Sequence, residues 1–134
     1  PILKVYARCA NLVHQWEVED TASIVMEMAD GAQVTASFAW NSKTWRHEFE
    51  LVGTEAKVYW HPYDAGQVVK TVGRQVDELE LTPAANVHQP LVEDFVQAVR
   101  QDRDPICPLA EAARTNALLD AIYRSAAEGK EVRL

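Results

Sequence analysis

The stretch VEDTASIVMEMADGAQVTASFAW, residues 18–40, predicts a β-hairpin and thereby decides the class of fold. Two runs of alternating polar and apolar residues flank Asp30-Gly31, a dipeptide typical of tight turns between antiparallel strands. The alternation has the period of two that a strand requires, because successive side chains point to opposite faces. We therefore expect a strand–turn–strand unit near the start of the chain.

The register of this hairpin depends on the length of its loop. A two-residue loop pairs Val25 with Ala36 and mixes polar and apolar side chains on both faces. A three-residue loop over residues 29–31, with Gly31 left-handed, pairs Ile24 with Ala36 and separates the two kinds of side chain. We predict the three-residue loop. The apolar face then carries Ala22, Ile24, Met26, Met28, Ala32, Val34, Ala36, Phe38 and Trp40, and the other face carries Thr21, Ser23, Val25, Glu27, Gln33, Thr35, Ser37 and Ala39.

A second hairpin is predicted in residues 46–61, RHEFELVGTEAKVYWH. Pairing Leu51 with Val58 and Phe49 with Trp60 gives this hairpin an apolar side. Shorter strand patterns occur in residues 2–9, 67–73 and 76–82. Together these segments predict about six or seven strands.

The last third of the chain has helical spacing instead. One helix is expected to begin at residues 88–90 and to end before Pro105, and a second to run from near Pro108 to about Glu128 with Gly129 as its C-cap. Residues 131–134 are expected to form a short edge strand. The expected apolar stripes are Leu91, Val92, Phe95, Val96 and Val99 in the first helix, and Leu109, Ala113, Ala117, Leu118, Ala121 and Ile122 in the second.

Strands followed by helices, rather than alternating with them, indicate an α+β fold. We predict an open, mostly antiparallel sheet of about six or seven strands, with the two C-terminal helices packed on one face. A chain of 134 residues, 48% hydrophobic and 25% charged, has the size and composition of one globular domain.

Composition also excludes some classes of binding partner and favours one cellular compartment. A net charge of −7 without a basic run argues against nucleic acid. No apolar run approaches the roughly 20 residues of a membrane span, so we expect no membrane partner. The two cysteines, Cys9 and Cys107, form no disulfide framework, which favours a reducing cytoplasm. Because a strand pattern begins directly after Pro1, we expect part of the protein to precede it.

Two Glu-Asp pairs, Glu19-Asp20 and Glu93-Asp94, are the first candidates for acid–base chemistry. Neighbouring residues of a strand project to opposite faces, and neighbours on a helix diverge by about 100°, so neither pair can act as a dyad. Near a helix N-terminus, Glu93 and Asp94 would oppose the macrodipole. We interpret both pairs as structural.

Other chemical motifs are absent from the sequence. The four histidines, His14, His47, His61 and His88, lack metal-ligand spacing, and neither cysteine has a neighbouring ligand or base, so no metal site is expected. No Gly-x-Ser-x-Gly elbow and no glycine-rich phosphate loop occur. We therefore expect neither catalytic nor cofactor-binding residues in this chain.

One cluster of aromatic residues stands out, WNSKTWRH at 40–47, followed by Trp60, His61 and Tyr63. Tryptophans beside Arg46 suit a ligand pocket or a protein interface. Trp40 and Trp60 can equally well cap the core. Trp45 lies in a polar segment and fits that second interpretation less well.

The order of these segments resembles the C-terminal domain of the Gfo/Idh/MocA (glucose–fructose oxidoreductase/inositol dehydrogenase) oxidoreductase family. The matching marks extend over nearly the whole chain. They are Val18-Glu19-Asp20-Thr21-Ala22, Asp30-Gly31-Ala32, Glu50-Leu51-Val52-Gly53-Thr54-Glu55, Leu91-Val92-Glu93-Asp94-Phe95 and Ala121-Ile122-Tyr123-Arg124-Ser125-Ala126, followed by Gly129. One departure is Ala56, where the family usually has a second glycine.

The resemblance implies a two-domain NAD(P)-dependent oxidoreductase that acts on a sugar, polyol or related hydroxyl compound. Residues 1–134 would be its single C-terminal substrate and oligomerisation domain, and an N-terminal Rossmann domain would be absent from this chain. The family's Glu-Lys-Pro and Asp-x-x-x-His motifs do not occur here, so the chain by itself is expected to be inactive. The expected partners are the missing Rossmann domain, a small-molecule substrate, and further copies of the chain contacted through the sheet face away from the helices.

The resemblance also points to a substrate site. An aromatic residue shortly before the strand at residues 49–52 often faces substrate in the family, and Trp45 looks like its counterpart. Arg46 and Trp40 are the neighbours that we expect beside it. The alternative is a stand-alone α+β ligand-binding or dimerisation module without redox activity.

Overall fold

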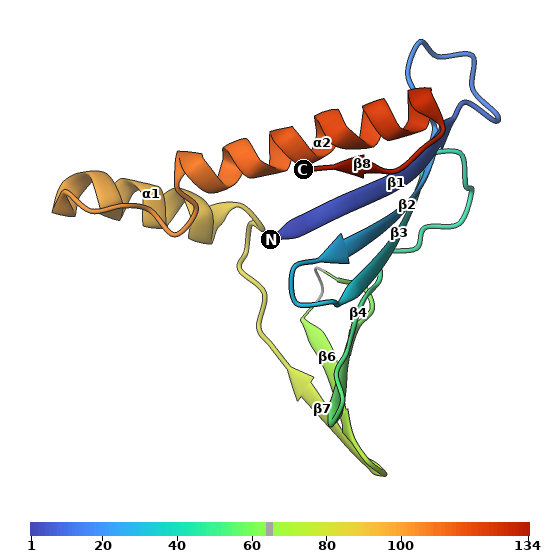
Figure 1. Ribbon diagram of the computed structural model, residues 1–134. Helices are drawn as coiled ribbons and strands as arrows, with labels where there is room; N and C mark the ends of the chain where they lie inside the picture. The colour runs from blue at the N-terminus through green and yellow to red at the C-terminus, as the bar shows by residue number, and fades with distance from the viewer. Residues whose placement is uncertain (64–65) are drawn as a thin grey trace. The chain divides into compact units, whose positions relative to one another are not determined.

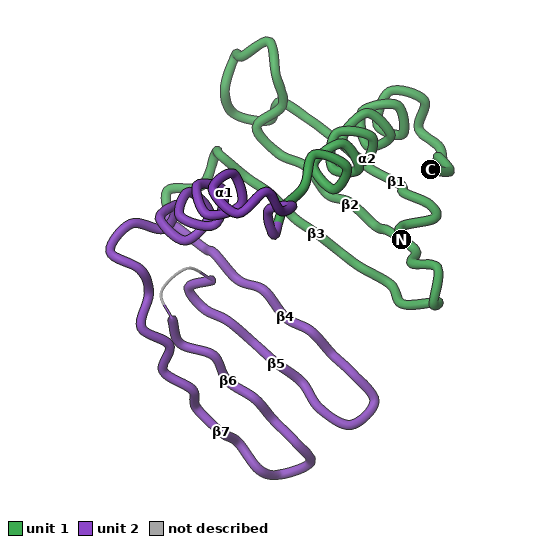
Figure 2. Tube along the Cα trace, turned by 90° about the vertical axis from the view of Figure 1, so that its left-hand side faces the viewer, with its two compact units in different colours: residues 1–43, 107–134 green, residues 44–106 purple. Residues whose placement is uncertain are grey.

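The computed structural model describes residues 1–63 and 66–134, and the chain divides into two compact units (Figures 1 and 2). Unit 1 consists of Pro1–Lys43 and Cys107–Leu134, and unit 2 of Thr44–Ile106. Each unit contains one helix and one antiparallel sheet of four strands. The two units are described separately below.

Unit 1 is a four-stranded sheet with one helix on it. Its elements are β1 (Ile2–Ala10), β2 (Thr21–Met28), β3 (Gln33–Ala39), α2 (Leu109–Glu128) and β8 (Val132–Arg133). The strand order is β3-β2-β1-β8, and every neighbouring pair is antiparallel. The expected edge strand at the end of the chain is thus confirmed as β8, which pairs with β1.

The β2–β3 hairpin has the register that the apolar pattern predicted. Ile24 faces Ala36, and Gly31 is left-handed with φ of 86°. The amide of Met28 donates to the carbonyl of Ala32 at 2.8 Å, which closes a three-residue loop. One face of the hairpin therefore carries apolar side chains, and the other face carries mostly small and polar side chains.

The core of unit 1 lies between the sheet and the C-terminal half of α2, which lies along one face of the sheet (Figure 1). Its buried side chains are Val5, Ala7, Ile24, Ala121, Ile122 and Val132. Ser125 is completely buried beside them; its Oγ accepts the amide of Ala7 at 2.9 Å and donates to the carbonyl of Lys130 at 2.7 Å. Ser125 thereby ties the end of α2 to β1 and to the turn before β8.

Unit 2 contains β4 (Phe49–Val52), β5 (Ala56–Trp60), β6 (Gln67–Val72), β7 (Gln75–Glu80) and α1 (Gln89–Gln101). The four strands pair in sequence order as an antiparallel meander. The second hairpin was also predicted correctly, since Phe49 faces Trp60 and Leu51 faces Val58. In the described part of this unit only Val68 and Ala98 are buried hydrophobic residues.

The structure confirms the α+β class and refines its details. Residues 1–63 and 66–134 contain eight strands in two sheets of four, whereas about six or seven strands in one sheet were expected. Residues 40–48, which connect β3 with β4 and include several bends, belong to neither sheet. Of the two helices, α2 packs on the sheet of unit 1, whereas α1 belongs to unit 2.

The helix boundaries agree with the sequence prediction, but the apolar stripes are only partly buried. All five residues of the α1 stripe are exposed, and Phe95 is 59% exposed. In α2 the stripe is buried at Ala121 and Ile122, whereas Leu109 at the start of the helix is 83% exposed. Within its own unit, therefore, α1 has little apolar packing, and α2 is anchored by its C-terminal half.

Candidate functional site

Five aromatic rings form a chain of contacts along one side of the β4–β5 hairpin. The ring of His47 lies 5.3 Å from Trp45 and 5.3 Å from Tyr63, edge to face in both cases. Phe49 lies 5.4 Å from Tyr63 and 5.6 Å from Trp60. We call these residues, Trp45, His47, Phe49, Trp60 and Tyr63, the aromatic cluster.

Backbone geometry explains why these rings meet. Residues 45, 47 and 49 alternate along the chain as it enters β4, and ring contacts connect Trp45 with His47 and both His47 and Phe49 with Tyr63. Trp60 pairs directly with Phe49 across the hairpin. The amide of Tyr63 donates to the carbonyl of His47 at 2.9 Å, which continues the pairing beyond the end of β4. The sequence alternation W-x-H-x-F was the signal that could have added His47 and Phe49 to the expected site.

The aromatic cluster is open to solvent at its outer end. Trp45 is 69% exposed, Tyr63 and Phe49 are about half-exposed, and Trp60 is partly buried. Exposed aromatic faces bind the C–H surfaces of a ligand while the polar atoms at their edges remain available for hydrogen bonds. The arrangement therefore suits a ligand that has both apolar C–H faces and hydroxyl groups.

Arg46 has a different environment from its neighbour Trp45. Its guanidinium donates to Glu48 at 2.6 Å, and Nδ1 of His61 lies 3.7 Å from the other oxygen of that carboxylate. The hydrogen bond from Arg46 lowers the pKa of Glu48, and the same bond raises the pKa of Arg46. Arg46 is thus held in an ion pair, rather than directed to the aromatic cluster.

Trp40, the third expected site residue, lies in unit 1. Its ring stacks against Phe38 with centroids 6.4 Å apart, and its carbonyl oxygen lies 3.4 Å from Nε2 of His14. It is largely exposed, so it does not cap the core of its unit. Trp60, the other tryptophan that was expected to be able to cap the core, is partly buried.

Asp20 is a buried carboxylate that organises the loop between β1 and β2. It accepts the amides of Leu12, Val13 and His14 at 2.9–3.0 Å, and it also accepts bonds from the side chains of Thr21 and Asn41. Burial opposes its ionisation, but these hydrogen bonds outweigh burial and hold the pKa of Asp20 well below its usual range. Asp20 is therefore a structural anion rather than a proton donor.

The remaining carboxylates of the two pairs form hydrogen bonds within the fold, in agreement with a structural role, but not all in the way that the sequence indicated. Glu19 accepts a hydrogen bond from Tyr123 at 2.8 Å, and Glu93 accepts one from Gln89 at 2.7 Å. The Ile106 amide at 2.7 Å and Arg103 at 2.8 Å both donate to Asp94, and they lower its pKa. Neither Glu93 nor Asp94 lies in the first turn of α1, so Asp94 fastens the segment after the helix instead of opposing the macrodipole.

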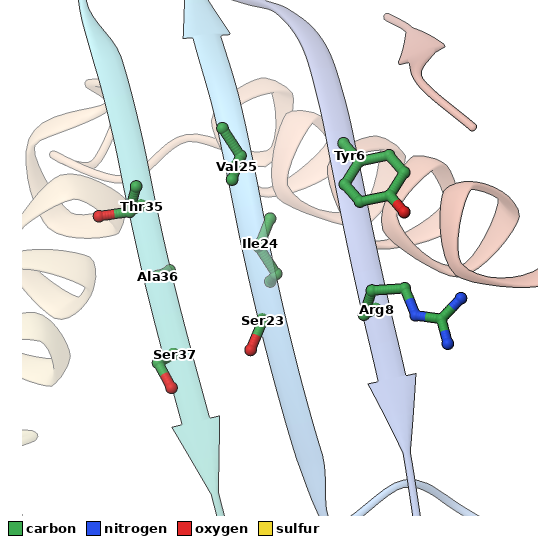
Figure 3. Close-up of a pocket in the computed structure, with 8 residues that line it drawn as sticks. All are labelled: Tyr6, Arg8, Ser23, Ile24, Val25, Thr35, Ala36 and Ser37. Carbon is green, nitrogen blue, oxygen red and sulfur yellow. The ribbon is translucent and has the colours of Figure 1, made fainter. Parts of the chain in front are cut away.

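A shallow hollow of about 390 Å³ lies on the face of the unit 1 sheet that is turned away from α2 (Figure 3). Tyr6, Arg8, Ser23, Val25, Thr35 and Ser37 line it from three neighbouring strands. Most of these side chains are small or bear hydroxyl groups. We call this surface the open face.

The described residues do not fit a dinucleotide or a metal ion. A dinucleotide site needs a glycine-rich turn between a parallel strand and a helix, whereas all strand pairs here are antiparallel and residues 86–88 and 107–108 before the helices contain no glycine. Within residues 1–63 and 66–134, no three potential metal ligands come together. Cys9 is partly buried, which raises the pKa of its thiol, and Cys107 is exposed; both are free. In the same residues no helix is long and apolar enough to span a membrane.

The sequence profile of the oxidoreductase family, C-terminal alpha/beta domain, matches residues 4–134. The chain belongs to this family. The proposed resemblance is thereby confirmed over nearly the whole length of the chain. None of the curated proteins compared with it matches the sequence.

Solved structures with the same fold include several oxidoreductases. Aldose-aldose oxidoreductase from Caulobacter crescentus, complexed with glycerol, is 20% identical with a TM-score of 0.86, and the match covers 99% of this chain and 41% of that one. The WlbA dehydrogenase from Bordetella pertussis, in complex with NADH and UDP-GlcNAcA, is 25% identical with a TM-score of 0.76, covering 100% and 40%. An oxidoreductase from Agrobacterium radiobacter, with NAD+, L-tartaric acid and magnesium, is 17% identical with a TM-score of 0.85, covering 98% and 43%.

The present chain therefore spans about two fifths of the length of the structures that it matches. The first and third of them are below 25% identity, so they show the fold alone. The family membership rests on the profile match, and it makes this chain a C-terminal domain of the oxidoreductase family.

Proposed function

We propose that this chain is the C-terminal domain of an NAD(P)-dependent dehydrogenase that acts on a sugar, a polyol or a related hydroxyl compound. Its family membership carries this proposal. The complex of the similar WlbA dehydrogenase with NADH and UDP-GlcNAcA supports the cofactor and the substrate class. In the intact enzyme, a hydride would pass between the nicotinamide and a carbon that bears a hydroxyl group.

We assign one wall of the substrate pocket to the aromatic cluster, with Trp45 as its outermost residue. A sugar or polyol offers C–H faces that stack on indole and phenol rings. Arg46 and Trp40 remain proposed as further substrate-binding residues, and Arg46 would act by positioning Glu48. Single substitutions of the three residues test the assignment separately.

The cofactor and the catalytic residues are assigned to a Rossmann domain that precedes this chain in the intact protein. The absence of a glycine-rich turn in the described residues supports this division, as does the two-fifths coverage of the matched structures. The chain alone should therefore be inactive. NAD and NADP remain alternatives for the cofactor, and a cytoplasmic location is proposed because the two free cysteines suit a reducing compartment.

The open face of unit 1 is proposed as the surface through which copies of the protein associate. Thr21, Ser23, Val25, Thr35 and Ala39 are small enough for two sheets to approach closely. An antiparallel sheet that is covered by a helix on one side commonly leaves the other side to solvent or to a partner.

The division of labour between the domains is tested by titrating NADH and NADPH into the isolated chain and into the intact protein. We expect saturable quenching or energy transfer only with the intact protein. Tight, saturable binding of either nucleotide to the isolated chain would overturn the assignment of the cofactor site. A stand-alone module without redox function would bind neither nucleotide in either form.

A further inference from the structure

Arg46 is the charged residue next to Trp45, the outermost member of the aromatic cluster. The side chain of Arg46 is 78% exposed, whereas the side chain of its partner Glu48 is only 27% exposed. The 2.6 Å hydrogen bond between them therefore joins an accessible cation to a carboxylate that is largely enclosed. Without this carboxylate, the guanidinium would be available to an anion carried by a ligand.

Glu48 is held from other sides as well. The hydroxyl of Tyr59 hydrogen-bonds to its carboxylate, and Nδ1 of His61 lies 3.7 Å from Oε1 of the same group. Tyr59 lies in β5 and pairs with Glu50 of β4, so the sheet fixes its backbone. Glu48 is therefore the fixed member of the ion pair, and Arg46 is the side chain that it restrains.

The charges beside the aromatic cluster cancel in pairs. Residues 45–61, all of which the structure describes, contain one further lysine or arginine, Lys57, and it lies 3.0 Å from Glu50. In the neighbouring strands, Lys70 lies opposite Asp77. The five residues of the cluster include no carboxylate, lysine or arginine. An anionic ligand group beside Trp45 would thus lose water without gaining a free cation from this hairpin, which is unfavourable.

Resting on the dehydrogenase function proposed above, we infer that Glu48 is a specificity-determining residue: by holding Arg46 in a neutral pair, it makes the aromatic cluster select an uncharged sugar or polyol over the corresponding sugar acid. The acid is a close competitor, because it has similar C–H faces and hydroxyl groups and differs by one carboxylate. A released Arg46, next to Trp45, could bind that carboxylate through two parallel hydrogen bonds. Glu48 excludes the acid by occupying the arginine that would bind it.

Nicotinamide reduction by the intact protein tests this role with matched neutral and acidic compounds. The pairs are D-glucose and D-glucuronate, D-galactose and D-galacturonate, D-mannose and D-mannuronate, and D-arabinitol and D-arabinonate. The readout is the ratio of kcat/KM for the acid to kcat/KM for its neutral partner. The natural protein should favour the neutral compound at least about tenfold. Glu48→Gln keeps the shape but not the charge, and should raise the ratio at least about fivefold.

Three further variants assign the effect to the ion pair. Arg46→Gln leaves Glu48 uncompensated and should lower the ratio, and it tests the inference even if Glu48→Gln does not fold. In the double variant both charges are gone, so the ratio should return to within about twofold of the natural value. Glu50→Gln removes an equal charge from the Lys57 pair and should leave the ratio unchanged. Raising the salt concentration to about 0.5 M should reduce the gain of Glu48→Gln.

The outcomes separate this inference from the proposed function. Reduction with none of the eight compounds would contradict the dehydrogenase function, and the role of Glu48 with it. A natural protein that prefers the acids, or a Glu48→Gln variant with an unchanged ratio, would overturn the role of Glu48 while the dehydrogenase function stands. A gain that persists in the double variant would do the same, because Arg46 would then not be its source. Circular dichroism melts of all variants verify that they are folded.

Discussion

The two units of this chain have the same number of strands but very different cores. Unit 1 buries a continuous cluster between its sheet and α2, together with the polar side chains of Asp20 and Ser125. Unit 2 has a four-stranded meander of the same size, yet its aromatic cluster is largely open and only Val68 and Ala98 are buried hydrophobic residues in its described part. The difference indicates that unit 1 supplies most of the stability of the chain, and that unit 2 presents its apolar side chains for binding.

The largest effect is expected from Asp20→Asn. An amide has the shape of the carboxylate but lacks its charge and can accept fewer of the five donated hydrogen bonds. We expect the melting temperature to fall on the order of 5–10 °C, measured by circular dichroism at pH 7. Glu19 is the neighbouring residue and is partly exposed, so Glu19→Gln should change the melting temperature much less.

Asp20 also predicts a response to acid. Its pKa is lowered in the folded chain, so its contribution to stability is complete above the unfolded value near pH 4 and is lost as the pH falls below that value. Denaturant melts at successive pH values below about 4 should therefore show a steeper loss of stability for the natural chain than for Asp20→Asn. Equal slopes would mean that other carboxylates dominate acid unfolding.

Ser125→Ala should cause the next largest loss of stability. It removes both hydrogen bonds that join α2, β1 and the turn at Lys130, and it leaves the buried amide of Ala7 without a partner. An unsatisfied buried group of this kind costs about 1–3 kcal/mol of the free energy of unfolding, measurable by urea titration. The matched control is Ser23→Ala on the open face; a similar loss there would contradict the role given to Ser125.

Asp94→Asn tests the same kind of carboxylate in unit 2. It weakens the bonds to Arg103 and to the Ile106 amide, but these partners are exposed. We expect a fall in melting temperature on the order of 2 °C, clearly smaller than that of Asp20→Asn. If Asp94→Asn were the more harmful of the two, the assignment of stability to unit 1 would be wrong.

Trp45→Ala should have the smallest effect on stability. The side chain is 69% exposed and contacts only the edge of the aromatic cluster, so the free energy of unfolding should change by less than about 0.5 kcal/mol. Urea titration measures this change. A large destabilisation would show that Trp45 is a packing residue and would remove the argument for a binding role.

Much of the fold could be predicted from the sequence because local rules agree with the final structure. The Asp30-Gly31 turn and the two-residue period set the β2–β3 register, and Pro108 and Gly129 delimit α2. The division into two sheets could not be predicted. Whether β3 and β4 pair with each other is not specified by the local sequence pattern of either strand. The apolar stripe of α1 was likewise predicted from its periodicity, but its exposure in the structure was not, because periodicity does not reveal whether a second element packs on the stripe.

The candidate site was predicted in part. Trp45 was identified from the resemblance, whereas its contact with the ring of His47 depends on the backbone path of residues 45–47, which the sequence does not specify. Arg46 was expected at the site because of its position in the sequence, but its guanidinium donates to Glu48 instead. The hydrogen bonds that Asp20 accepts could not be predicted from the sequence. Three of their donors are backbone amides, and the loop that supplies these amides has no recognisable sequence pattern.

The most direct test of the account measures nicotinamide reduction by the intact protein with neutral sugars and polyols, comparing the natural protein with Trp45→Ala. We predict that the natural protein reduces NAD+ or NADP+ in the presence of at least one of these compounds. Trp45→Ala should raise the KM for that compound at least about tenfold, while the Kd for NADH or NADPH stays the same. An intact protein that shows no such reduction, or a Trp45→Ala variant with an unchanged KM, would contradict the assignment of this chain as a substrate-binding domain.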